Sequence, residues 1–271
     1  MRSKANVVKH MADSLITGRA LTIAGYDPSS GAGITADLQV FAAHGVAGVS
    51  AITALTVQSA KGVQRVEPVS PDLLAETLDF WGQIGTIKGV KLGMLGTAAL
   101  VDVVTDFLKK SPVLRERIVL DPVIRSSSGA ELLDSEGVHR LISGILPLVG
   151  WVTPNLEEAA RLLSEPVGDR ETIPHQAVRL AKLGGDGLNV VITGGHLDPP
   201  DDFLRSSSGE EVWLPGERVE ATSIHGTHGT GCVFSSALLC RLLLGDEGAD
   251  AVRLAKRSVV NRLQGLEPHG S

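Results

Sequence analysis

Short hydrophobic runs alternate along this chain with longer segments in which hydrophobic positions recur every three or four residues. The short runs predict strands at 20–24, 49–53, 89–95, 117–121, 151–153 and 189–193. The longer segments predict helices near 32–44, 71–83, 97–109, 134–144, 155–163, 173–183, 229–244 and 246–265. Strands that are hydrophobic throughout, each followed by a helix, are typical of a parallel sheet covered on both faces.

The domain organisation follows from the absence of any solenoid-type repeat or clear linker in the sequence. We expect a single α/β domain over residues 20–271 and a poorly ordered extension over residues 1–19. The string RSSSG occurs twice, at 125–129 and at 205–209. Both copies are typical of solvated connections, and either could be a mobile flap over a site.

Composition narrows the class of protein. Hydrophobic residues make up 43% of the chain and aromatic residues only 3%, which fits an interior of aliphatic side chains. The net charge of −6 argues against nucleic-acid binding. The first twenty residues lack the apolar core of a signal peptide, and no run of 18 apolar residues follows. We therefore expect a cytoplasmic protein that does not associate with membranes.

The two cysteines, Cys232 and Cys240, exclude a disulfide framework. If both lie on one helix, eight residues at about 1.5 Å each separate them by roughly 12 Å. That separation exceeds the ~7 Å that a disulfide spans between Cα atoms. Cys240 lies within an apolar run and is expected to belong to the core.

The first glycine-rich stretch, GYDPSSGAGITADLQ at 25–39, satisfies a loose dinucleotide-binding pattern through Gly31, Gly33 and Ala36. Residues 26–30, however, separate the expected strand from these glycines, where that fingerprint requires a tight turn. The second strand also lacks the acidic residue that would bind a ribose. The glycines therefore indicate a turn that packs a helix on the sheet, which leaves the carboxylate of Asp37 without an explanation.

The second stretch, IHGTHGTGCVFSSALLC at 224–240, places Gly229, Thr230, Gly231 and Cys232 at the start of a buried helix that ends at Gly245. Glycine lets a backbone approach a ligand closely. The first N–H groups of a helix have no internal partner and lie at the positive end of its dipole. Together these features predict an anion pocket suited to a phosphate or a phosphoryl transition state. No GxxxxGK[ST] motif is present.

Cys232 stands where a helix N-terminus and little steric cover would lower the pKa of a thiol. It could accept a proton from an attacking hydroxyl, bond to a substrate, or simply be a small residue packed at the helix start. His225 and His228 suggest a metal pair, but no third ligand has suitable spacing, so metal binding by these histidines is not favoured.

Seven segments in fixed order carry a family resemblance: GYDPSSGAGITADL, TALTVQSAKGV, VKLGML, VLDPV, TPNLEEA, TGGH and THGTGC. With them the chain resembles the hydroxymethylpyrimidine/phosphomethylpyrimidine kinases of thiamine biosynthesis, members of the ribokinase-like superfamily, from about residue 20 to residue 256. The resemblance implies a three-layer α/β/α fold with a mostly parallel central sheet. It also implies transfer of the γ-phosphoryl group of ATP to a pyrimidine hydroxymethyl group, and a second round on the monophosphate.

The resemblance also implies roles for individual residues. Expected substrate contacts are Gly25, Asp37, Gln58, Met94 and Val123; ATP contacts are Thr193, Gly194 and Gly195; Mg²⁺ ligands are Asp121 and Glu158; and the catalytic segment is Gly229, Thr230, Gly231 and Cys232. Gln58 can both donate and accept toward an aminopyrimidine edge, and a hard cation held by one or two carboxylates suits phosphoryl transfer. Met94 and Val123 could face the ring or be ordinary strand-end core.

The sequence departs from the family pattern in several places. Thr193 stands where many pyrimidine kinases have a lysine near the ATP phosphates, Ser59 replaces an asparagine, and residues 126–129 read SSSG in place of AKSG. Tyr26 is larger than the usual residue. Two other functions stay open: a kinase for pyridoxine or a related ring alcohol, and a pyrimidine-binding sensor with vestigial catalysis. Expected partners are small molecules, and a homodimer is an open expectation.

Overall fold

The computed structural model describes residues 18–59, 62–126, 128–223 and 226–266. The strands are β1 (Arg19–Tyr26), β2 (Ala47–Ser59), β3 (Gly62–Pro68), β4 (Ile87–Leu92), β5 (Ile118–Leu120), β6 (Trp151–Val152), β7 (Asn189–Ile192), β8 (Asp202–Arg205) and β9 (Glu211–Leu214). The α-helices are α2 (Gly33–Ala43), α3 (Pro71–Ile84), α4 (Ala98–Lys110), α5 (Ser135–Arg140), α6 (Leu156–Leu163), α7 (Ile173–Gly184), α8 (Thr230–Leu244) and α9 (Gly248–Leu263).

These strands form one sheet in the order β3-β2-β1-β4-β5-β6-β7-β8-β9. The pairs from β2 through β7 are parallel, so their carboxyl ends share one edge. Antiparallel pairs extend the sheet at both sides, with β3 beyond β2, and with β8 and β9 beyond β7. The prediction of a mostly parallel central sheet is confirmed.

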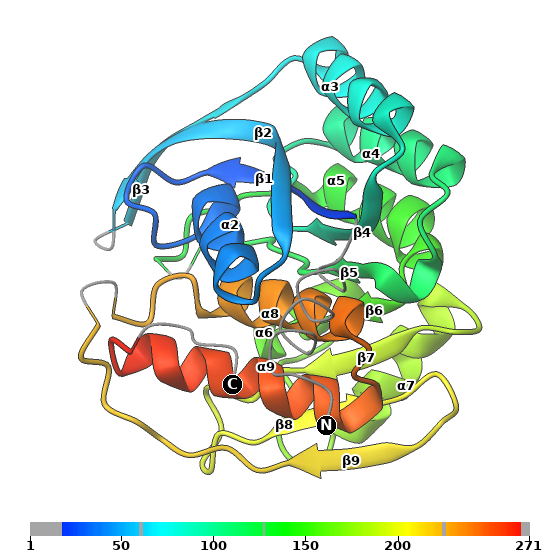
Figure 1. The fold of residues 1–271 in the computed structure, drawn as a ribbon. Coiled ribbons are helices and arrows are strands. Elements are labelled where there is room, and N and C mark those ends of the chain that lie inside the picture. The colour runs from blue at the N-terminus through cyan, green and yellow to red at the C-terminus, as the bar shows by residue number, and fades with distance from the viewer. Residues whose placement is uncertain (1–17, 60–61, 127, 224–225, 267–271) are drawn as a thin grey trace, which may run out of the picture.

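Helices cover both faces of the sheet (Figure 1). Side chains alternate along each strand, so on β5 Ile118 and Leu120 join one hydrophobic core while Val119 joins the other. The first core contains residues of α3, α4, α5, α6 and α7. The second contains residues of α2, α8 and α9. This is the three-layer α/β/α arrangement that the resemblance implies.

The structure adds three strands that hydrophobic periodicity does not predict, namely β3, β8 and β9. Each is an edge strand or lies next to one, and β3 has no fully buried side chain. The second RSSSG string forms the turn of the β8–β9 hairpin, as a solvated connection. In the first RSSSG string, at 125–129, Ser127 lies outside the described residues. The predicted helix near 134–144 begins as α5 and continues as a π-helical segment at Leu141–Ile145.

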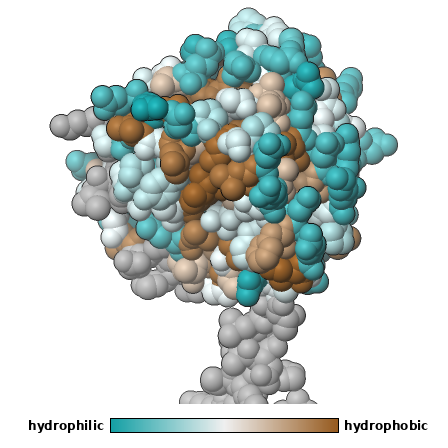
Figure 2. Space-filling view, turned by 90° about the horizontal axis from the view of Figure 1, so that it is seen from above, coloured by the Kyte–Doolittle hydropathy of each residue, from teal (hydrophilic) through white to brown (hydrophobic). Residues whose placement is uncertain are grey.

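Residues 1–17, which make up almost all of the expected N-terminal extension, lie outside the described residues. Arg19, the last residue of the expected extension, is the first residue of β1 and pairs with Ala47. Among the described helices, none combines the length and apolar character needed to cross a bilayer. Viewed from above, one face of the molecule carries a central hydrophobic area bordered by hydrophilic residues (Figure 2).

Helix α8 is largely apolar, as expected for a helix that is enclosed by its neighbours. It packs against α2 and α9 laterally and against β4 and β5 beneath. Residues 233–240 are all buried, as expected for a helix without a polar face. Because α8 lies over β4 and β5 and its first turn contacts Asp121 at the end of β5, its N-terminus is fixed at the carboxyl edge of the sheet.

Candidate active site

The predicted site residues collect at the carboxyl edge of the parallel strands. Gly25 lies at the end of β1, Met94 follows β4, Asp121 follows β5 and Thr193 follows β7. Open α/β sheets bind ligands at this edge. The separate segments quoted for the resemblance therefore come together because the strands that precede them are parallel neighbours.

A small apolar cluster, called the apolar wall below, joins β2 to the segments that follow β4 and β5. Ala54, Met94 and Leu132 make a small hydrophobic cluster of their own, and the half-buried Val123 packs against it. A Cβ on Gly25 would lie 3.1 Å from the Met94 sulfur, so a side chain here would press on that residue. The structure thus brings together three predicted substrate contacts, Gly25, Met94 and Val123.

Gln58 lies on the inward side of β2. Thr56 and Gln58 are half-buried, whereas their neighbours Leu55 and Val57 are each 52% exposed. The pairing with β3 shifts register between Val57 and Gln58. An amide at this position can donate and accept hydrogen bonds toward a ligand on the same side of β2 as Ala54.

The first turn of α8 approaches the loop before α2 very closely. Gly229 is the N-cap residue and has φ +76°, in the left-handed region. A Cβ there would overlap the carbonyl oxygen of Gly31, so both the backbone conformation and the space require glycine. Thr230, Gly231 and Cys232 follow as the first helical residues, whose N–H groups have no partner within the helix.

The Cys232 side chain hydrogen-bonds with the buried carboxylate of Asp121. Ser235 donates a hydrogen bond to Asp121 at 3.1 Å, and a Cβ on Gly231 would be 3.7 Å from the same oxygen. The pKa of the Cys232 thiol is raised to about 12, mainly by burial; Lys91 and the Gly33 N–H oppose the rise, and Asp37 and Asp121 add to it. The predicted low pKa is therefore wrong: in this half-buried residue, burial and the two nearby carboxylates favour the protonated thiol.

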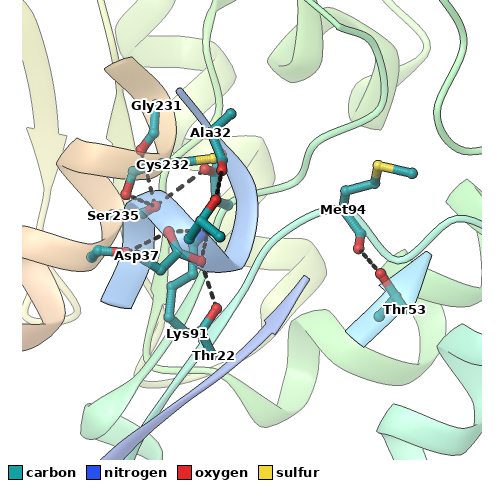
Figure 3. A network of polar contacts seen from close by, with 12 residues as sticks. Thr22, Ala32, Asp37, Thr53, Lys91, Met94, Gly231, Cys232 and Ser235 are labelled. Atoms are coloured by element: carbon teal, nitrogen blue, oxygen red, sulfur yellow. Dashed lines mark hydrogen bonds and ion pairs between the residues drawn. The ribbon is translucent and has the colours of Figure 1, made fainter. Parts of the chain in front are cut away.

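Asp37 lies below the site and is fully buried. Its carboxylate accepts hydrogen bonds from Thr22 at 2.5 Å and from Ser236 at 2.7 Å, and both its oxygens lie 3.0 Å from Lys91 Nζ (Figure 3). These partners occupy both carboxylate oxygens, so neither is free for a substrate. The predicted substrate contact of Asp37 therefore differs from what the structure shows. It instead ties together α2, α8, β1 and β4, the four elements that lead into the site.

Lys91 is the cation of this buried pair, with no exposed surface. Burial alone would lower the pKa of its ammonium group, but Asp37, Cys232 and Asp121 together raise that pKa above its ordinary value. Lys91 therefore stays charged. Its ammonium group bonds the Asp37 carboxylate and is close enough to Cys232 and Asp121 to interact with them electrostatically.

Asp121 and Glu158 form a pair of buried carboxylates, 4% and 7% exposed. Burial raises the pKa of Asp121, with Lys91 opposing and Asp37 adding to the rise. Burial also raises the pKa of Glu158 well above its usual range, and the charge of Asp121 contributes. This excess of negative charge fits a divalent cation. The described residues contain no group of three or more His, Cys, Asp or Glu suited to a metal, so any cation would share few protein ligands.

Glu158 has a second role at the start of α6. Its side chain accepts a hydrogen bond from the Asn155 backbone N–H at 2.9 Å, and the Asn155 side chain accepts one from the Glu158 N–H at 2.9 Å. This reciprocal capping box fixes the helix start. The carboxylate is thereby held in place facing the same edge as Asp121.

The predicted nucleotide contacts differ in their availability. Thr193 is half-buried, and its N–H donates to Pro154 O at 2.9 Å. The Gly194 N–H donates to the buried carboxylate of Asp202 at 2.9 Å. This N–H is therefore not free to bind a phosphate, which differs from the predicted ATP contact. Gly195 is exposed, and a Cβ added there would meet no atom within 4 Å. Of these three residues, Gly195 is exposed, Thr193 is half-buried and Gly194 is buried.

Sequence reasoning did not identify Asp27. Its carboxylate is fully buried and accepts hydrogen bonds from the N–H groups of Ser29 at 2.8 Å and Ala32 at 2.9 Å. It also pairs with His228 Nε2 at 2.9 Å. The DPSSG string is a turn signal that could have indicated the local bonds, but nothing in the sequence pairs residues 27 and 228. His225 lies outside the described residues, so the metal pair cannot be placed.

The fold and this site define a kinase of the ribokinase-like class: a three-layer sheet with a glycine-led helix N-terminus beside a carboxylate at its carboxyl edge. The family model described as Phosphomethylpyrimidine kinase matches residues 27–269. The chain therefore belongs to the phosphomethylpyrimidine kinase family.

Individual relatives agree with this assignment. The hydroxymethylpyrimidine/phosphomethylpyrimidine kinase of Aquifex aeolicus (strain VF5) is 37% identical, and the match covers 93% of this chain and 96% of that protein. The crystal structure of phosphomethylpyrimidine kinase from Clostridium difficile 630 has a TM-score of 0.77 at 32% identity, covering 90% of this chain and 98% of that one. The ADP complex of Bacillus subtilis pyridoxal kinase has a TM-score of 0.79 at 30% identity, covering 90% and 91%.

Removal of the buried cation should destabilise the protein. Lys91→Met leaves the Asp37 carboxylate buried without its charge partner, so we expect a loss of about 3–5 kcal/mol in the free energy of unfolding. The double variant Lys91→Met/Asp37→Asn removes both charges and should recover more than half of that loss. Urea unfolding of the three proteins measures this. Equal stabilities for the single and double variants would show that the loss does not come from an unpaired buried carboxylate.

The raised pKa of Cys232 predicts a specific alkylation profile. Because the thiol is protonated up to about pH 12, iodoacetamide should react slowly at pH 7.5, and the rate should still rise with pH above 9.5. The measurement uses a Cys240→Ala background, so that Cys232 is the one cysteine of the chain. A rate that levels off near pH 7 would show a low pKa and refute the effect of burial.

Proposed function

We propose that this chain transfers the γ-phosphoryl group of ATP to the hydroxymethyl group of 4-amino-5-hydroxymethyl-2-methylpyrimidine, and then phosphorylates the monophosphate, in thiamine biosynthesis. One observation carries the proposal: a helix N-terminus headed by Gly229 and bearing Cys232 lies at the same sheet edge as the apolar wall of Gly25 and Met94. Family membership supports both the reaction and the substrate.

In this proposal the pyrimidine ring lies against Met94 and Val123, and Gln58 pairs with its amino edge. An amide matches an aminopyrimidine because it supplies one donor and one acceptor. Gly25 leaves room for the ring beside the Met94 sulfur. Asp37 acts indirectly, since its carboxylate is fully engaged by Thr22, Lys91 and Ser236.

The transfer step forms a bond between the substrate oxygen and the γ-phosphorus and breaks the bond to the β–γ bridging oxygen. The amides of Gly229, Thr230, Gly231 and Cys232 hold the oxygens of the transferring group at the positive end of α8. A loose transition state requires little base assistance. We therefore assign the protonated Cys232 thiol to holding the substrate oxygen, and the hydroxyl proton passes to an oxygen of the transferred phosphoryl group.

Asp121 and Glu158 are the proposed holders of Mg²⁺, which neutralises phosphate charge when it is bound. Their mutual burial and raised pKa values fit that role. We propose Thr193 and Gly195 as the nucleotide contacts. Gly194 contributes by shape instead, because its N–H binds Asp202 and a Cβ there would overlap the Asp201 carbonyl oxygen.

A second candidate is phosphorylation of pyridoxal or a related ring alcohol, favoured by the likeness to the Bacillus subtilis pyridoxal kinase. A pyrimidine-binding sensor with vestigial catalysis is the third, motivated by threonine at position 193. The homodimer and the cytoplasmic location stay predictions. Leu55 and Val57 on β2 are half-exposed apolar residues that a second copy of this chain could cover.

A turnover assay separates these functions. With ATP and Mg²⁺, we expect phosphorylation of the hydroxymethylpyrimidine with a kcat/KM at least tenfold above that for pyridoxal or pyridoxine. Product analysis at long times tests the second phosphorylation. Preference for the pyridine alcohols would support the second candidate, and tight pyrimidine binding without turnover would support the sensor.

Two substitutions separate the chemistry from ring binding. Cys232→Ala should lower kcat by about 100-fold with little change in folding, because it removes a group beside the reacting oxygen. Gln58→Ala should mainly raise the KM for the pyrimidine, by roughly tenfold, through the loss of a ligand hydrogen bond. Steady-state kinetics checks both. A near-normal kcat for the first, or an unchanged KM for the second, would remove that residue from its role.

A further inference from the structure

Asp27 organises the loop between β1 and α2. Its two oxygens receive the Ser29 N–H, the Ser29 hydroxyl and the Ala32 N–H, all between 2.8 and 2.9 Å. Thr35 donates to its carbonyl oxygen at 3.1 Å. These hydrogen bonds hold the pKa of Asp27 below its usual value, although burial opposes them. The loop is therefore built around a buried carboxylate at the end of a central strand.

His228 connects this loop to the one that precedes α8. Its Nε2 lies 2.9 Å from Asp27 Oδ2, and its side chain is 13% exposed. Because Asp27 is ionised, its oxygen is an acceptor, and Nε2 must carry the proton. A hydrogen bond to a charged acceptor is stronger than one between neutral groups. Two loops 201 positions apart in the sequence are thus joined by a charge-assisted bond.

The bond lies immediately next to the anion pocket. His228 directly precedes Gly229, which is in the left-handed conformation and sits on the Gly31 carbonyl. A shift of His228 therefore moves the Gly229 peptide and the amides that follow it. Asp27 does not share that freedom, since it is fixed by bonds within its own loop. The pair sets where the first turn of α8 stands relative to the end of β1, and hence relative to the apolar wall beside Gly25.

We propose that His228 is a positioning residue for phosphoryl transfer, holding the amides of residues 229–232 in register with the substrate pocket through its hydrogen bond to Asp27. The proposal rests on the function proposed above for the identity of the substrate. It assigns His228 to the placement of the phosphoryl group and not to a metal, nor to direct contact with the pyrimidine. Misplacement of reacting groups by about 1 Å can cost 10²-fold in rate.

Three variants test it by steady-state kinetics with saturating ATP. His228→Ala should lower kcat by roughly 10- to 100-fold and change the KM for the pyrimidine less than about threefold, because the ring pocket is made by other residues. His228→Gln keeps a side-chain N–H donor and should recover most of kcat. His175→Ala, at an exposed position on α7, is the matched control and should behave as wild type. A purely structural role would lower the melting temperature without this split between kcat and KM.

Hydrogen–deuterium exchange measures the link between the loops independently of turnover. In His228→Ala, peptides covering 27–33 and 226–233 should both exchange faster, while His228→Gln and His175→Ala should match wild type. The kcat of the double variant Asp27→Asn/His228→Ala should be no lower than that of the slower of the two single variants, Asp27→Asn and His228→Ala. Both substitutions act through the same hydrogen bond, so their effects should not add.

Three results would overturn the proposal: a kcat for His228→Ala within twofold of wild type, a Gln variant as impaired as the Ala variant, or faster exchange confined to 226–233. If wild type does not phosphorylate the pyrimidine, the proposed function fails, and the exchange measurement still decides whether the two loops are coupled.

Discussion

The tightest constraint on the site is the contact between the first turn of α8 and the loop that precedes α2. Gly229 rests on the Gly31 carbonyl with no room for a side chain, and the helix behind it is enclosed by α2, α9 and the sheet. The core therefore fixes the body of α8, and the contact with Gly31 and the bond from His228 to Asp27 set the position of its first turn. A helix end held this firmly can direct its free N–H groups at one point, which is what an anion pocket for a transferring phosphoryl group requires.

The charges below that helix end explain why the site is arranged for phosphate. Lys91 is paired with Asp37, while Asp121 and Glu158 lie nearby with raised pKa values. Among these described groups one buried cation faces three buried carboxylates, so the two at the sheet edge are short of positive charge. A bound divalent cation would balance them. The same surplus of negative charge, added to burial, keeps the Cys232 thiol protonated, which makes it a partner for the substrate oxygen more readily than a strong base.

The sequence was sufficient where local pattern decides structure. The central strands are hydrophobic runs followed by helices, so β1, β4, β5, β6 and β7 could be predicted. Strands β3, β8 and β9 could not, because edge strands are short and keep exposed positions, and their pairing partners define them. The start of α3 is local in the same way, because the Ser70 side chain accepts a hydrogen bond from the Leu73 N–H.

Long-range contacts account for what could not be predicted from the sequence at the site. The resemblance located Asp37, but its partner Lys91 lies 54 positions away, and only the fold shows that the carboxylate is fully engaged. The pKa of Cys232 was predicted in the wrong direction because only the fold shows its burial and the carboxylates of Asp37 and Asp121 near its sulfur. The pairing of Asp27 with His228 could not be predicted for the same reason.

The most direct test is a crystal structure of the protein with the pyrimidine, ADP, Mg²⁺ and aluminium fluoride, which mimics the transferring group. We predict that the fluoride ligands accept hydrogen bonds from the N–H groups of residues 229–232, with the substrate oxygen beside the Cys232 sulfur. Fluoride ligands held elsewhere, with those amides turned toward the protein interior, would contradict the anion pocket at the start of α8.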